Sequence, residues 1–65
     1  MNPRGECIKE LKRLGFTLKE HGAKHDRYYN EELRYAVTVK RSNFDEDDTR
    51  YIMQEIRRVI RSRGQ

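Results

Sequence analysis

The sequence predicts an α+β domain with the element order α-β-β-β-α, in which a three-stranded antiparallel sheet carries two helices on one face. Apolar residues recur at helical spacing near both ends of the chain and alternate with polar residues in its middle. Glycines and polar turn residues separate these segments. With 65 residues, of which 40% are charged and 34% hydrophobic, the chain can build only one small core. We therefore expect a single domain over residues 1–65.

The first predicted helix begins at Pro3, because proline suits the first helical turn, and Asn2 is a candidate N-cap. Gly15 is placed to end this helix. The apolar residues of the helix repeat at helical spacing: Cys7, Ile8, Leu11 and Leu14. We expect this apolar side to face the sheet.

Three strands are expected between the helices, over residues 16–21, 25–29 and 33–40, with turns at residues 22–23 and 30–32. In the first strand Phe16 and Leu18 alternate with polar residues, which predicts that both lie in the core. The third strand is the clearest, because four apolar side chains alternate along it: Leu33, Tyr35, Val37 and Val39.

The C-terminal segment predicts the second helix. Its apolar stripe consists of Ile52, Ile56, Val59 and Ile60, with Met53 at the edge. Asn43 or Asp45 can cap its start, and the acidic run 45–48 lies where the helix dipole is positive. Neighbouring residues on a helix point in different directions, so we expect this run to stabilise the helix and not to bind a metal.

Charge and cysteine content limit the classes of function. The net charge is +4, and outside the acidic run 15 basic residues stand against 7 acidic ones, a balance of +8 that suits a polyanion such as nucleic acid. Cys7 is the single cysteine, which excludes an internal disulfide and fits a reducing compartment. No segment resembles a signal peptide or a membrane span, so we expect a cytoplasmic protein.

The chemistry is expected on the second strand. If Tyr28 joins the core, strand alternation places His25, Arg27 and Tyr29 together on the opposite, open face. A histidine can move protons near neutral pH, an arginine can hold a phosphate, and a tyrosine can stack on RNA bases. Asp26 points to the other face and is a poor partner for His25. On this pattern alone, the alternative that His25 is an ordinary exposed strand residue stays open.

Four segments of the chain resemble, in order, segments of HicA toxins. Residues 8–16 (IKELKRLGF) are similar to the opening helix and strand of that family, residues 37–41 (VTVKR) to a later strand, and residues 49–60 to the closing helix. Residues 21–29 (HGAKHDRYY) resemble the active-site strand of the family, and the Gly-x-x-His-x-x-Tyr spacing is the specific part. The resemblance covers nearly the whole chain.

This resemblance implies a fold like the double-stranded-RNA-binding domain and a metal-independent endoribonuclease, an mRNA interferase that blocks translation and needs no cofactor. It also implies a HicB-type antitoxin as the partner that neutralises the toxin. The catalytic histidine of the family falls on His25 and its core aromatic residue on Tyr28, while His21 has no role. The candidate RNA contacts are Lys24, Arg27, Tyr29, Lys40 and Arg41.

Two positions depart from the family pattern. Ala23 and Lys24 stand where the family often has Gly-Ser, and Lys24 is either a phosphate contact or a solvated turn residue. The segment 40–42 (KRS) stands where the family often has Pro-Arg-His, and the missing histidine argues against a separate histidine acid. A non-catalytic RNA-binding module of the same fold is the alternative function.

Overall fold

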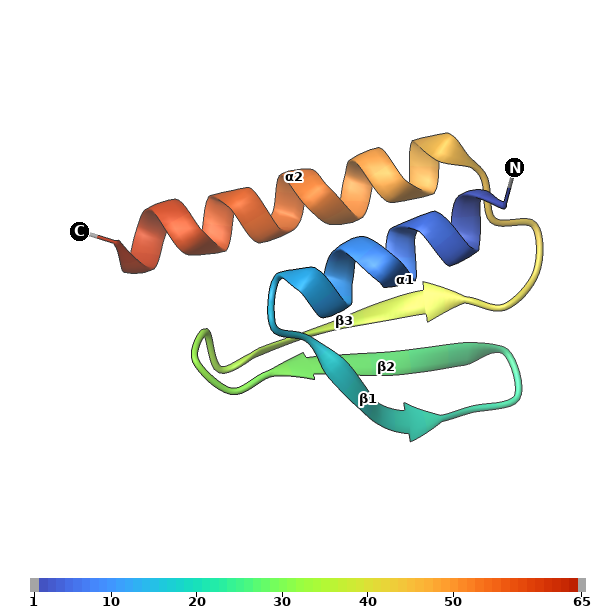
Figure 1. Cartoon of the computed structure of the whole chain (residues 1–65), viewed down its shortest axis with the longest axis horizontal. Coiled ribbons are helices and arrows are strands. Elements are labelled where there is room, and N and C mark those ends of the chain that lie inside the picture. The colour runs from blue at the N-terminus through green and yellow to red at the C-terminus, as the bar shows by residue number, and fades with distance from the viewer. Residues whose placement is uncertain (1, 65) are drawn as a thin grey trace.

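The computed structural model describes residues 2–64 and confirms the predicted order of elements (Figure 1). Over this range the elements are α1 (Pro3–Arg13), β1 (Thr17–His21), β2 (His25–Asn30), β3 (Tyr35–Lys40) and α2 (Glu46–Arg63). The strands form one antiparallel sheet in the order β1-β2-β3. Both helices run in the same direction, and both begin at the end of the molecule where the β1–β2 turn lies (Figure 1).

Both helices begin at side-chain caps. The Asn2 side chain accepts a hydrogen bond from the Gly5 backbone N–H at 3.1 Å, as predicted. Of the two candidates for α2, Asp45 is the cap: its carboxylate accepts from the backbone of Asp48, and the Asp48 side chain accepts from the Asp45 backbone. The acidic run thus satisfies the first N–H groups of α2, which is the structural role expected for it.

The core lies between both helices and one face of the sheet. Tyr28 is the register partner of Val37, and these side chains meet Leu11 of α1 and Ile56 of α2 in one cluster. Phe16, which comes directly before β1, is fully buried in the same cluster. The eight buried apolar residues are Cys7, Leu11, Phe16, Tyr28, Val37, Val39, Ile52 and Ile56. One sheet face is therefore covered by the helices, and the other is accessible to solvent.

The first strand departs from the prediction that Leu18 lies in the core. The register shifts between Leu18 and Glu20, so that Lys19 is an extra residue on β1, and Leu18 is 49% exposed. All five residues of β1 are exposed, and the core cluster draws its sheet residues from β2 and β3. The alternation gave the correct face for Leu18, which is opposite the core residue Tyr28 in register, but the prediction that Leu18 is buried was wrong.

The β2–β3 turn begins one residue later than predicted, because Asn30 belongs to β2 and is buried. Its side chain donates to the Leu14 carbonyl at 3.0 Å and accepts from the Leu33 N–H at 2.9 Å, so it fastens the turn to the end of α1. Leu33 consequently lies in the turn and β3 begins at Tyr35. Asn30 also lies against Gly15, whose φ of +103° favours glycine.

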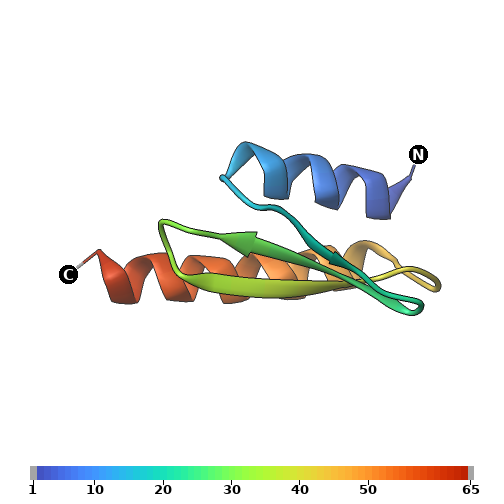
Figure 2. The same cartoon turned by 90° about the horizontal axis from the view of Figure 1, so that it is seen from below.

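The C-terminal turns of α2 extend beyond α1 and the sheet in both views (Figures 1 and 2). Ile60, predicted for the buried stripe, is 43% exposed and lines a surface hollow together with Leu14, while Ile52 and Ile56 are buried. Four arginines in the C-terminal half of α2 are exposed: Arg57, Arg58, Arg61 and Arg63.

Candidate nucleic-acid interface

The sheet face opposite the helices carries three of the predicted site residues. His25 and Arg27 of β2 are exposed and Tyr29 is half-buried, in the alternating pattern expected of a strand with one covered face. Their register partners on β3 are Lys40, Thr38 and Ala36, in that order. The structure therefore brings a histidine, an arginine and a tyrosine to one accessible surface.

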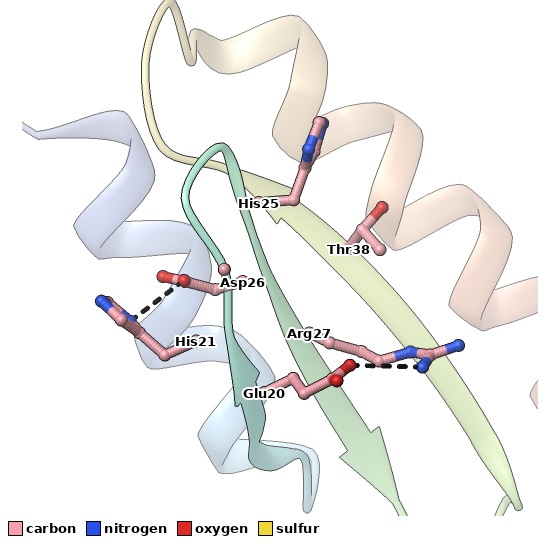
Figure 3. A pocket seen from close by; sticks show the side chains of 7 residues that line it. Glu20, His21, His25, Asp26, Arg27 and Thr38 are labelled. Carbon is pink, nitrogen blue, oxygen red and sulfur yellow. Dashed lines mark hydrogen bonds and ion pairs between the residues drawn. The ribbon is translucent and has the colours of Figure 1, made fainter.

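A shallow hollow of about 300 Å³ lies at the β1–β2 end of the sheet, lined by side chains of the open face and by His21, Gly22 and Asp26 around the turn (Figure 3). His25, Arg27 and Thr38 extend from neighbouring positions of β2 and β3, and Glu20 of β1 lies across from Arg27 at 3.5 Å. Beyond Arg27, the ammonium group of Lys19 lies 5.9 Å from the centre of the Tyr29 ring. Lys19 of β1 thus adds a basic side chain beside Tyr29.

The turn before β2 sets the position of His25. The Gly22 N–H donates to the His25 carbonyl at 3.0 Å, and a Cβ on Gly22 would lie only 2.4 Å from that oxygen. A side chain at residue 22 would therefore push the two strands apart. Within residues 2–64 the His25 imidazole has no hydrogen-bond or ion-pair partner, so its orientation is set by the strand alone.

The other three predicted contacts are spread out. Lys24 is exposed in the β1–β2 turn. Lys40 is next to His25 in register, but its ammonium group lies 3.2 Å from the Asp48 carboxylate. The pKa of Asp48 lies below its ordinary value because its carboxylate accepts a backbone hydrogen bond from Asp45 and is close to Lys40. Arg41 lies away from His25, beside His21 and Asp26.

A charged cluster around Asp26 was not found by sequence reasoning. Asp26 is 5% exposed on the helix side of β2, and its Oδ2 accepts from Arg4 Nη2 of α1 at 2.6 Å. Its other oxygen, Oδ1, lies 3.2 Å from His21 Nδ1 (Figure 3). The same oxygen lies 3.6 Å from Arg41 Nη1. The sequence held one signal for this cluster, an acidic residue at a position of β2 that faces the core. A buried carboxylate needs cationic partners, so such a position predicts nearby basic side chains.

The cluster keeps Asp26 ionised. Burial by itself raises the pKa of this carboxyl group, but the hydrogen bond from Arg4 and the charges of Arg41 and His21 outweigh it, so the pKa lies below its ordinary value of 3.8. Arg4 Nε also donates to the Lys40 carbonyl at 2.6 Å. Arg4 and Asp26 therefore tie the start of α1 to the centre and edge of the sheet.

Other reactive groups are poorly placed for chemistry. Cys7 is fully buried, and burial raises the pKa of its thiol, so it is not available as a thiolate nucleophile. In the part of the chain that the structure describes, no three His, Cys, Asp or Glu side chains are grouped to hold a metal ion. Nor does any helix within this part have the length and apolar character needed to cross a bilayer.

The fold and the site together define a small basic α+β domain with one open sheet face that carries an accessible histidine. The chain matches no protein-family model, no curated protein and no solved structure in the comparisons with known proteins.

Proposed function

We propose that this domain is a toxin endoribonuclease that cleaves mRNA and thereby inhibits translation. The observation that carries the proposal is the accessible His25 beside Arg27 and Tyr29 on the face that the helices leave free. These residue types supply a proton-transfer group, a phosphate contact and a base-stacking surface. The resemblance of residues 21–29 to the active-site strand of HicA toxins supports the same assignment.

RNA cleavage requires few protein groups, because the nucleophile is the 2′-hydroxyl of the RNA itself. His25 takes the proton of that hydroxyl as its oxygen attacks the neighbouring phosphorus. The bond to the 5′-oxygen breaks, this oxygen takes a proton from water, and a 2′,3′-cyclic phosphate remains. Arg27 stabilises the negative charge that develops on the phosphate oxygens.

A non-catalytic RNA-binding module is the second candidate. It is favoured by one observation: among residues 2–64 no carboxylate or other group orients the His25 imidazole. A cleavage assay on single-stranded RNA, with and without a chelator, separates the two functions. The ribonuclease proposal requires cleavage that survives the chelator, whereas the binding module leaves the RNA intact.

RNA affinity should depend strongly on salt. Basic side chains outnumber acidic ones by eight outside the acidic run, so phosphate contacts release counterions and the logarithm of the binding constant should fall linearly with the logarithm of the salt concentration. Fluorescence anisotropy of a labelled RNA across a salt titration measures this slope. An affinity that stays constant across the titration would argue against nucleic acid as the ligand of this domain.

We also propose an acidic protein partner, a HicB-type antitoxin, that covers His25 and contacts Arg27 or Arg41. The reason is that both arginines are exposed and that a toxin must be neutralised in its own host. Co-expression with the antitoxin encoded beside it should give a stable complex and restore growth. Growth arrest that persists, with no complex on co-purification, would count against this partner.

A further inference from the structure

Two guanidinium groups share one carboxylate at the β1–β2 end of the molecule. Arg4 holds Asp26 at 2.6 Å and is largely buried, with 25% of its side chain exposed. Arg41 lies farther from the same carboxylate, at 3.6 Å, and 37% of its side chain is exposed. Arg4 is therefore the main partner of the single negative charge, and the positive charge of Arg41 is left largely uncompensated.

The guanidinium group of Arg41 is nevertheless fixed. Its Nη1 donates to the Gly22 carbonyl at 2.8 Å and lies 2.6 Å from His21 Nε2. The Arg41 backbone N–H also donates to the Lys24 carbonyl at 3.0 Å. In the described part of the chain every side-chain contact of Arg41 is made by Nη1, so the donors on Nε and Nη2 point to no protein acceptor.

His21 lies between Asp26 and Arg41. Arg41 Nη1 is 2.6 Å from Nε2 and 3.3 Å from Nδ1 of His21, so the imidazole ring lies against the end of the guanidinium group. On the other side of the ring, His21 Nδ1 is 3.2 Å from Asp26 Oδ1, a buried oxygen that has no hydrogen-bond partner among the described residues. Asp26 and His21 together therefore confine the end of the Arg41 side chain.

We propose that Arg41 is a preorganised binding site for a backbone phosphate of RNA, with His21 and Asp26 as its positioning residues. The inference rests on the proposed function, because it takes RNA as the ligand. A fixed arginine with two free donors matches the bidentate geometry of a phosphate and loses little side-chain entropy on binding. His21 and His25 flank the β1–β2 turn, and their side chains point to opposite faces of the hairpin (Figure 3).

The site therefore serves a phosphate other than the one that is cleaved. An RNA strand that passes the tip of this turn meets Arg41 on one side, Lys24 at the tip and His25 on the other side. Arg41 sets the position of the strand, and His25 acts on a neighbouring linkage.

The test compares RNA binding by the whole chain carrying Arg41→Ala, His21→Ala or His21→Gln, with Arg61→Ala as the control for loss of an exposed arginine. Anisotropy of a labelled non-cleavable single-stranded RNA is measured across a salt titration. Arg41→Ala should weaken binding roughly 10- to 100-fold, the usual effect of a charge-assisted hydrogen bond. It should also make the salt slope shallower by about 0.7, as for one phosphate contact on a single strand.

His21→Ala should behave differently, because the arginine charge remains. We expect a loss of about threefold in affinity with an unchanged salt slope, since only the orientation of Arg41 is lost. His21→Gln should restore the affinity, because its side-chain oxygen can accept the hydrogen bond from Nη1. A wild-type circular dichroism spectrum confirms that each variant is folded.

Three results would overturn the inference. If Arg41→Ala binds RNA like Arg61→Ala while the wild type binds in a salt-dependent way, the proposed function survives and this site does not. If Arg41→Ala affects only the binding of an acidic protein partner, Arg41 is a protein contact. If the wild type binds no RNA, the proposed function and this site fail together.

Discussion

His25→Ala is expected to lose RNA cleavage by roughly 10²- to 10⁴-fold, the usual contribution of a general acid–base group. The fold should be unchanged, because the His25 side chain is exposed and makes no hydrogen bond or ion pair with the described residues. RNA affinity should fall little, since the phosphate contacts come from lysine and arginine side chains. Cleavage of a fluorescent RNA, affinity by anisotropy and circular dichroism measure these three quantities separately.

His21→Ala is the matched control for this experiment, because it removes a second exposed histidine from the same hairpin. It should retain cleavage at saturating RNA and show only the modest loss of affinity expected from Arg41. If His25→Ala cleaves at the wild-type rate, the proposed catalytic residue is wrong. If His25→Ala unfolds, His25 has a structural role in β2, and a catalytic role is no longer needed to explain its presence there.

Phe16→Ala is expected to unfold the domain. Phe16 is fully buried between α1, the sheet and α2, and truncation of a buried phenylalanine typically costs about 3–5 kcal/mol. A chain of this length has a total stability of about 3–10 kcal/mol at typical values per residue. Thermal and urea unfolding followed by circular dichroism should show a lost or strongly shifted transition.

Leu18→Ala is the comparison for Phe16→Ala. Both residues were predicted for the core from one alternating pattern, but Leu18 is 49% exposed in the structure. Its truncation should therefore change the free energy of unfolding by less than about 1 kcal/mol. Equal destabilisation by the two variants would contradict the exposed position of Leu18 and show that β1 contributes to the core as the sequence predicted.

The fold was predictable from the sequence because each element carries a local signal. The caps of both helices are set by residues next to them in the chain, and the core face of β3 follows from simple alternation. The bulge at Lys19 was not predictable, because an extra residue on an edge strand leaves no mark in the hydrophobic pattern. The exposure of Ile60 was missed for a related reason, since helical spacing predicts the face of a residue but not how far the neighbouring helix covers it.

The site was predictable only as far as it depends on strand alternation. That rule placed His25, Arg27 and Tyr29 on one face and Asp26 on the other, as observed. It could not place Arg41 beside His21, because that contact joins the segment after β3 to the end of β1 through side chains. Long-range ion pairs of this kind depend on tertiary packing and on the competition between Arg4 and Arg41 for one carboxylate.

The bulged edge strand also limits how other chains can associate with this one. A regular exposed edge offers a row of backbone N–H and C=O groups on which a foreign strand can align, which is the usual start of fibril growth. In β1 the irregular step at Lys19 breaks that row, and the charged side chains of Lys19 and Glu20 oppose close approach of a neighbour. Of the two edges of the sheet, the one formed by β1 is in this way a poor template for a neighbouring strand, while the sheet face opposite the helices stays accessible.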